Sequence, residues 1–285
     1  MRAVGDSLRV ALLLGSGPKY DYLCSRIAER FSVVAVVRET GTPPRLRTRT
    51  GRARACQRAW RRLTLRDRYR RRFFATATPA ATGAVVVKSV NDPAARAALE
   101  EVRFDIAVVC GTSLIRQPLL ESLGCALNLH AGCLPWYKGN HTVFFAYRDR
   151  AWDRLGSTIH LLDAALDGGP VIATVRPEMF PRDNDEHLYC RAAESGISLL
   201  IEVLSRLESG EQPVWAAPQA AGGTMFRHRD RGLAQDLRVA VSRLRPAARP
   251  PRAGQVVRWS TRTAQAIDVR SRLAGNAQPP SAEKP

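Results

Sequence analysis

Short, almost uniformly apolar segments recur along this chain and alternate with polar or amphipathic ones. The clearest of them lie at 8–17, 32–39, 104–112 and 125–132. Strands that are apolar on both faces are typical of a parallel sheet covered by helices on each side. The segment at 92–102 begins with Asp92 and Pro93, a helix cap followed by a residue suited to the first turn. We therefore expect an α/β fold with a Rossmann-like, mostly parallel sheet and helices on both faces.

Positive charge is concentrated in two segments of the chain. The net charge is +18, and residues 45–72 hold 13 Arg against Asp67 alone. Residues 227–285 hold 12 Arg and Lys284 against four acids, so the remainder is close to neutral. Such blocks are usually solvated faces or flexible arms. A more specific interpretation is that they bind phosphate groups. We expect a main domain at 8–226 with an Arg-rich helical insertion at 41–80, followed by a basic, Arg- and Pro-rich extension at 227–285 that is partly disordered.

The composition also bears on the cellular location of the protein and on metal binding. The longest apolar runs are far shorter than the ~18 residues that a membrane helix needs. The N-terminal residues lack an apolar core followed by a small-residue cleavage site. The six cysteines show neither C-x-x-C spacing nor a metal-finger pattern, so reduced thiols are the default. We expect a cytoplasmic protein with no membrane partner and no metal.

The glycines at 15 and 17 follow the first apolar segment and suggest a dinucleotide-binding turn. The full G-x-G-x-x-G pattern needs a third glycine at position 20, where this chain has Tyr20. Pro18 also lacks the backbone N–H group that a phosphate would accept from. We therefore expect a strand-to-helix turn that lines a pocket, without a bound dinucleotide.

Two polar residues interrupt the apolar segment at 125–132. Asn128 and His130 are two residues apart, so in a strand their side chains point to the same face. They stand at the end of an expected parallel strand, where open α/β folds bind their ligands. A lone Asn or His there is more often a structural group, and Asp167 in "LDGGP" could simply belong to a hairpin turn. His160 could likewise be a core histidine.

Taken together, these segments resemble a known family. "NLHAGCLPWYKG" followed by "GSTIHLLDAALDGGPVI" is similar to the folate-dependent formyltransferases, which include glycinamide ribonucleotide formyltransferase and the catalytic domain of methionyl-tRNA formyltransferase. The similarity runs clearly over about 85–181 and weakly over 8–38. It does not include the Arg-rich insertion or the extension.

The resemblance implies a catalytic trio of Asn128, His130 and Asp167, with His160 in a supporting role. It also implies that a formyl group moves from 10-formyltetrahydrofolate to a primary amine through a tetrahedral intermediate. An amide and an imidazole can both hydrogen-bond a developing oxyanion, and a carboxylate can hold a protonated imidazole and relay protons. No metal is needed for this chemistry. The co-substrate is expected to lie against residues named by the same resemblance: Ser113, Leu114, Ile115, Ala164 and Ala165.

A rival, nucleophilic mechanism would need a reactive thiol. Cys133 and Cys110 are the candidates, and Cys133 follows His130 by only three residues. Cys133 falls where the family usually has an apolar residue, so we expect it to line the pocket without forming a reactive thiolate.

The formyl acceptor stays open between several classes. We expect a small amine, similar to glycinamide ribonucleotide or a nucleotide-linked amino sugar. The first turn departs from the ribonucleotide-binding pattern, although Lys19 could still contact a phosphate. One alternative is a methionyl-tRNA formyltransferase-like enzyme that uses the basic insertion for tRNA. Another is a non-catalytic, basic RNA- or partner-binding protein on a formyltransferase core.

Overall fold

The chain is described by a computed structural model that covers residues 7–41, 49–75, 83–245 and 249–275. Within these residues, eight strands form one sheet in the order β11-β8-β7-β5-β4-β1-β2-β3. The neighbouring strands β3, β2, β1, β4 and β5 are parallel to one another. The pairs β5–β7, β7–β8 and β8–β11 are antiparallel. The expected mostly parallel α/β sheet is confirmed. The strands of this sheet are β1 Arg9–Leu14, β2 Ser32–Glu39, β3 Val85–Val87, β4 Ile106–Cys110, β5 Ala126–His130, β7 Ser157–Leu161, β8 Val171–Arg176 and β11 Val256–Trp259.

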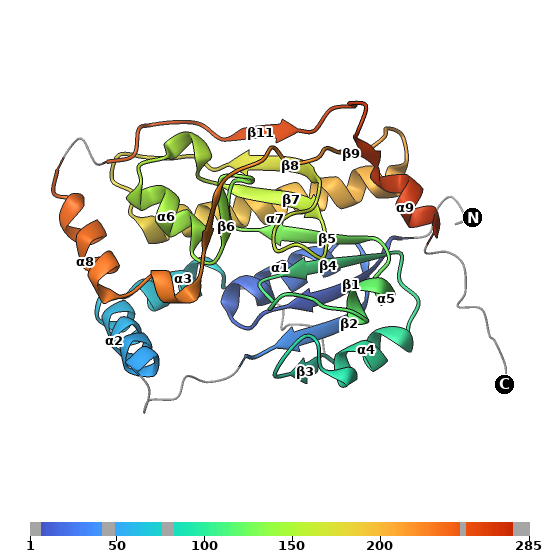
Figure 1. Ribbon diagram of the computed structural model, residues 1–285, viewed down its shortest axis with the longest axis horizontal. Helices are drawn as coiled ribbons and strands as arrows, with labels where there is room; N and C mark the ends of the chain where they lie inside the picture. Colours follow the sequence, from blue (N-terminus) through green and yellow to red (C-terminus); the bar gives the residue numbers. More distant parts are fainter. Residues whose placement is uncertain (1–6, 42–48, 76–82, 246–248, 276–285) are drawn as a thin grey trace.

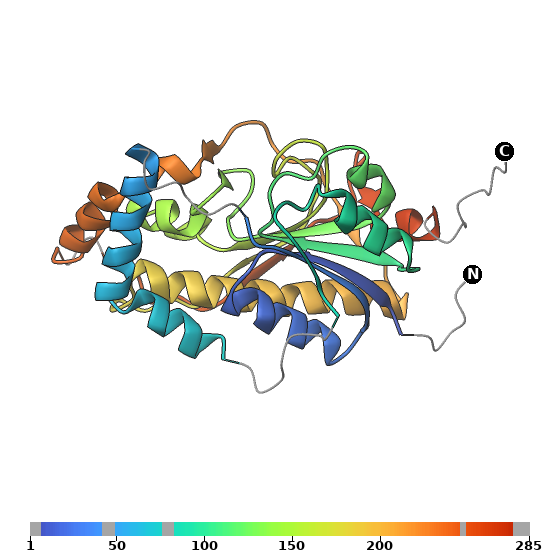
Figure 2. The same ribbon diagram turned by 90° about the horizontal axis from the view of Figure 1, so that it is seen from below.

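Helices cover both faces of this sheet, as Figures 1 and 2 show. The strand period of two divides β1 between them: Val10 and Leu12 pack toward α1 and α7, whereas Ala11 and Leu13 pack toward α4 and α5. A strand buried on both sides has no polar face, and this explains the continuous apolar runs in the sequence. The helices are α1 Pro18–Ala28, α4 Pro93–Glu100, α5 Leu119–Ser122, α6 Thr142–Arg148 and α7 Asp185–Ser209.

The Arg-rich insertion forms two helices, α2 (Arg49–Leu63) and α3 (Arg66–Phe73), at one end of the molecule (Figure 1). Two other parts of the expected insertion, at 42–48 and 76–80, lie outside the described residues. Of the described insertion side chains, Arg58, Arg62, Arg68, Arg71 and Arg72 are exposed. This part agrees with a solvated basic face.

Three other insertion arginines differ from that expectation, because they are buried or half-buried in ion pairs with the start of α7. Arg66 binds Asp185 through two parallel contacts of 2.7 and 2.8 Å. Arg70 Nε lies 2.7 Å from Glu186 Oε1, and Arg61 Nη2 lies 3.3 Å from Glu186 Oε2. Acids in the first turn of a helix also complement its dipole. Part of the insertion's charge therefore attaches it to the core.

The segment after 227 also packs onto the main domain more closely than we expected. Helix α8 (Leu233–Ser242) contacts α2, and β11 pairs with β8 at the edge of the main sheet. Arg231 joins the same buried network through Asp236 at 2.6 Å and Asp185 at 3.4 Å. Residues 276–285 of the expected extension lie outside the described residues. The remaining elements are the short strands β6 Tyr137–Gly139, β9 Trp215–Ala216, β10 Thr224–Phe226 and β12 Ile267–Asp268, helix α9 Val269–Gly275, and the 3-10 helices η1 Trp152–Arg154 and η2 His228–Asp230.

No helix in the described part of the chain is long and apolar enough to span a membrane.

Candidate functional site

A cavity of about 780 Å³ opens where β1, β2, β4 and β5 end. Parallel strands place their carboxyl ends at one edge of the sheet, and the loops that follow form the walls. Asn128, His130, His160 and Asp167 all line this cavity. The turn after β1 does not present a third glycine to the cavity, as a dinucleotide-binding loop would, but Tyr20. Its Tyr20 ring packs over Gly111, where an added Cβ would lie 2.0 Å from the Tyr20 hydroxyl.

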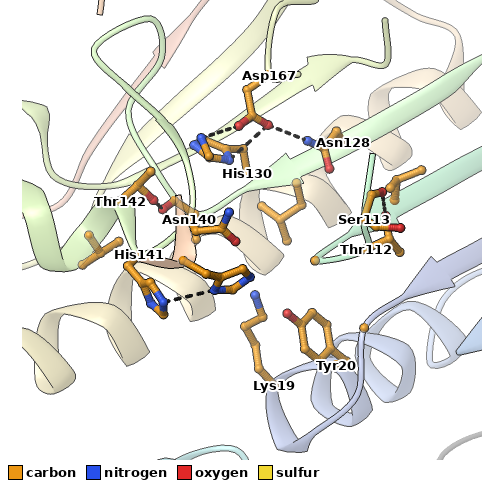
Figure 3. Close-up of a pocket in the computed structure, with 18 of the residues that line it drawn as sticks. Lys19, Tyr20, Thr112, Ser113, Asn128, His130, Asn140, His141, Thr142 and Asp167 are labelled. Carbon is orange, nitrogen blue, oxygen red and sulfur yellow. Dashed lines mark hydrogen bonds and ion pairs between the residues drawn. The ribbon is translucent and has the colours of Figure 1, made fainter. Parts of the chain in front are cut away.

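The predicted trio is brought together at one side of the cavity, as Figure 3 shows. His130 Nδ1 lies 3.3 Å from Asp167 Oδ1, and Asn128 Nδ2 lies 3.4 Å from the same oxygen. His130 and Asp167 are buried, whereas Asn128 is partly exposed to the cavity. The alternation rule correctly placed Asn128 and His130 on one face of β5. The approach of Asp167 depends on the β7–β8 hairpin, which folds back beside β5.

Asp167 is held in an unusual backbone conformation. Its φ of 50° lies in the left-handed region, which non-glycine residues adopt rarely. Two contacts from distant segments fix it there. The Gly139 amide donates to Asp167 Oδ2 at 2.7 Å, and Gln219 Nε2 donates to the backbone oxygens of Asp167 and Gly169 at 2.9 and 2.7 Å. Sequence reasoning missed Gln219, because no local pattern connects it with a turn 52 residues away.

His130 has a hydrogen-bond acceptor on each side of its ring. Its Nε2 lies 2.9 Å from the Tyr137 backbone oxygen, which can only accept, so Nε2 carries a proton. Nδ1 faces the Asp167 carboxylate. A second proton, placed between His130 Nδ1 and the Asp167 carboxylate, can therefore be held by either group. Gly132 fits against the same ring, since an added Cβ would lie 2.4 Å from His130 Nε2.

His160 determines how the Asn128 amide is turned. His160 Nδ1 donates to the Leu161 backbone oxygen at 2.8 Å, so in the neutral ring Nε2 is an acceptor. Asn128 Nδ2 donates to this Nε2 at 2.9 Å. The amide nitrogen of Asn128 is thus occupied by His160 and Asp167, and its oxygen is the atom left for the cavity. His160 and Asn128 meet because they are directly paired across β5 and β7.

Burial keeps His160 neutral over a wide pH range. Desolvation, followed by the neighbouring His130, lowers the pKa of His160 to about 4, against an opposing effect of Asp167. In the unfolded chain the ring binds a proton near pH 6.5, so between pH 6.5 and 4 the unfolded state binds more protons. The contribution of His160 to the free energy of unfolding is therefore at its maximum above pH 6.5 and falls as the pH drops toward 4.

We expect this loss to amount to about 3 kcal/mol for His160, at about 1.4 kcal/mol per pKa unit. Urea unfolding at pH 7.5, 6, 5 and 4.5 measures it. A His160→Gln variant should show a flatter profile over the same range. An identical pH dependence in both proteins would contradict the assignment.

Four of the five residues expected to hold the co-substrate line the cavity. Ser113, Leu114, Ile115 and Ala165 line the cavity. Ala164 is exposed and is not among the lining residues. The 113–116 loop is braced by Asn91, which donates to the Leu114 oxygen at 2.9 Å and accepts from the Arg116 amide at 2.8 Å. This wall is therefore preformed.

The structure does not support a reactive thiol in the cavity. Cys133 is half-buried, but it lines a separate small hollow, which corrects our expectation that it lines the main pocket. Burial raises the pKa of Cys133, so the thiolate is disfavoured at neutral pH. Among the described residues, no group of three or more His, Cys, Asp or Glu side chains is placed to hold a metal ion.

The opposite end of the cavity is built from segments that sequence reasoning did not connect. The insertion supplies Arg61 and Arg70 to this wall, and the segment after 227 supplies His228 and Arg231. His141 Nε2 lies 3.3 Å from His228 Nδ1. Burial, followed by Arg231 and His228, lowers the pKa of His141 to about 3, so this ring is neutral at pH 7.

Comparison with known proteins defines the class to which this fold and site belong. The sequence model of the formyl transferase family matches residues 53–204, just over half of the chain. The chain belongs to the formyl transferase family.

Particular relatives add detail to this classification. The methionyl-tRNA formyltransferase of Paracoccus denitrificans (strain Pd 1222) is 38% identical over 173 residues, which is 58% of this chain and 52% of that protein. The chain spans about half the length of these curated relatives.

Solved structures support the fold. A 4-N formyltransferase from Francisella tularensis has a TM-score of 0.54 at 14% identity, covering 86% of this chain and 90% of its own. A sugar N-formyltransferase from Shewanella sp. FDAARGOS_354 has a TM-score of 0.53 at 14% identity, covering 89% and 99%. The expected family resemblance is confirmed.

Proposed function

We propose that this chain transfers a formyl group from 10-formyltetrahydrofolate to the primary amine of a small metabolite. The observation that carries the proposal is the meeting of Asn128, His130 and Asp167 in one cavity within a formyl transferase fold. The reaction forms a bond between the formyl carbon and the acceptor nitrogen and breaks the bond to the folate nitrogen. One proton leaves the attacking amine and one is gained by the folate nitrogen.

His130 and Asp167 fit the proton handling in this reaction. Asp167 stabilises a doubly protonated His130 ring through the 3.3 Å contact at Nδ1. Such a ring can donate to the oxyanion that develops on the formyl oxygen, if that oxygen replaces Tyr137 O as the partner of Nε2. The pair can then return a proton to the leaving nitrogen.

For Asn128, the two ends of the amide can serve different steps. As placed, its amide oxygen is the free atom and can accept a hydrogen bond from the attacking amine. Nδ2 carries two hydrogens: one is donated to His160 Nε2 at 2.9 Å, and the other meets Asp167 Oδ1 at the longer distance of 3.4 Å. We propose that the formyl oxygen replaces Asp167 as the acceptor of this second hydrogen, so that Asn128 acts as the oxyanion donor inferred from the sequence.

The loop at 113–116 and Ala165 fit the role of a co-substrate wall. Leu114 is 39% exposed and Leu166 is 43% exposed at the rim, so apolar surface is available for a flat ring system. We propose that the folate lies here, next to the trio. The bound co-substrate would supply the formyl group.

Gly132→Ala tests whether His130 must keep its position. The new methyl group would lie 2.4 Å from His130 Nε2 and 2.8 Å from the Tyr137 oxygen, so the ring must shift. A displacement of about 1 Å at a catalytic group lowers kcat on the order of 10²-fold. Steady-state kinetics measures this, with Gly254→Ala as the matched control because nothing lies within 4 Å of that position. Equal kcat values in the two variants would argue against the role of His130.

A small acceptor is favoured over tRNA by the wall of the cavity. Arg61, Arg70 and Arg231 line its far end and are already held in ion pairs, so they are not free to bind the phosphates of a tRNA. The methionyl-tRNA alternative is supported by the names of the curated relatives and by the exposed arginines of α2 and α3. We keep it as the second candidate.

The deciding experiment incubates the protein with 10-formyltetrahydrofolate and one amine at a time. The panel contains glycinamide ribonucleotide, a nucleotide-linked 4-amino sugar and methionyl-tRNA, and release of tetrahydrofolate is followed. Turnover of the small amines supports the proposal, and turnover of methionyl-tRNA alone supports the second candidate. A cellular phenotype that survives Asn128→Ala, together with no turnover of any amine, would favour a non-catalytic binding protein.

A further inference from the structure

One basic side chain at the far end of the cavity differs from its neighbours. Four basic residues line this end: Lys19, Arg61, Arg70 and Arg231. Each of the three arginines forms at least one ion pair, with Glu186, Asp185 or Asp236. Among the described residues, no acid lies within 4.0 Å of the Lys19 ammonium group, and no hydrogen bond from Lys19 Nζ is found.

Lys19 is also buried. Its side chain is 8% exposed, although a lysine is almost never buried without a partner. Figure 3 shows that its amine points into the cavity, on the opposite side from Asp167. The ammonium group lies 4.4 Å from the centre of the Tyr20 ring and 5.8 Å from that of Tyr189. Aromatic faces stabilise a cation, but they do not satisfy its three N–H donors.

Three groups of the first turn are not free to bind an anion beside Lys19. Pro18 has no N–H group, and the Tyr20 amide donates to the Gly17 oxygen at 2.9 Å. The Ser16 hydroxyl points away and donates to the Glu39 oxygen at 2.9 Å.

Building on the proposed function, we infer that Lys19 binds an anionic group of the formyl acceptor, a phosphate or a carboxylate. An anion at this position would complete the donors of a buried ammonium group and form a charge-assisted hydrogen bond. The neutral His141 ring and the paired arginines line the space around Lys19, and none of these groups is an anion that would compete with the acceptor for its ammonium group. With Lys19 and the trio at opposite sides of one cavity, the acceptor would be held by its anion at one end while its amine reaches His130. The acceptor class is therefore a small primary amine that also carries an anionic group.

The binding test needs no turnover. Isothermal titration of the full chain with inorganic phosphate and, separately, with acetate measures the site directly and distinguishes the two anions by their relative affinity. We expect Lys19→Met to weaken binding of the preferred anion at least about 10-fold, and Lys19→Arg to restore most of it. Lys88→Met is the matched control, because Lys88 is exposed and lies outside the cavity. Unfolding curves for each variant identify any that fails to fold.

A kinetic test then links this site to the acceptor. With an anionic amine that is turned over, Lys19→Met should raise KM at least about 10-fold and change kcat much less, because the ammonium group contacts the acceptor away from the reacting atoms. Binding of neither anion by the wild type, or equal binding by wild type and Lys19→Met, would overturn the inference while leaving formyl transfer intact. Lys19-dependent anion binding without turnover of any amine would instead count against the proposed function.

Discussion

Replacing His130 by Ala should lower kcat for formyl transfer about 10²–10⁴-fold, the range expected for loss of a general acid–base group. The ring lies between Asp167 at 3.3 Å and the Tyr137 oxygen at 2.9 Å, and alanine removes both contacts. Because the chemical step depends on the proton that this ring holds, the effect should appear in kcat more than in KM. Steady-state release of tetrahydrofolate with an accepted amine measures it.

The matched control for His130→Ala is His187→Ala. His187 lies on α7 outside the cavity, with its side chain 35% exposed beside Asp183. We expect kcat within about threefold of the wild type for this variant, since its loss leaves the reacting atoms untouched. If His130→Ala retains wild-type kcat while folding normally, the proposed mechanism is wrong.

Replacing Asp185 by Ala should lower the free energy of unfolding by about 3–5 kcal/mol, the cost of removing one partner from a buried ion pair. Asp185 is 2% exposed, and it binds Arg66 through two contacts and Arg231 through a third at 3.4 Å. Its loss leaves two guanidinium groups buried with fewer acceptors. Urea unfolding monitored by circular dichroism measures the change.

The control for Asp185→Ala is an exposed ion pair on the same helix. Glu202 and Arg206 lie one turn apart on α7 at 2.6 Å, with side chains 48% and 40% exposed. We expect Glu202→Ala to change the free energy of unfolding by no more than about 0.5 kcal/mol, because water screens this pair. Comparable losses in both variants would contradict a buried network at the start of α7.

The buried network also changes the interpretation of the Arg-rich insertion. From composition alone, its arginines suggest a solvated or phosphate-binding arm. Arg61, Arg66 and Arg70 instead attach α2 and α3 to Asp185 and Glu186, and two of them reach the cavity wall. The insertion thus contributes to the site itself, whereas its exposed arginines keep a surface available for a polyanion.

Local rules were sufficient for the sheet and for two members of the trio. Apolar runs predicted buried strands because a strand covered on both faces has no polar side. Alternation placed Asn128 and His130 on one face because neighbouring side chains in a strand point in opposite directions. The approach of Asp167 followed from resemblance to the family, because no rule of spacing brings a residue 37 positions away to the same cavity.

Only the tertiary structure decided the orientation of Asn128 and the make-up of the far end of the cavity. The Asn128 amide is turned by His160, whose tautomer is set by the Leu161 oxygen across the β5–β7 pairing. Lys19, Arg70 and His228 come from three distant segments, and within the described part of the chain Arg70 is paired with Glu186 while Lys19 has no acid at ion-pair distance. The fold class and the family could therefore be inferred from the sequence, since these depend on short-range periodicity and a family pattern. Charge pairing between distant segments depends on packing, and it leaves Lys19 as the cation that we propose to bind the acceptor.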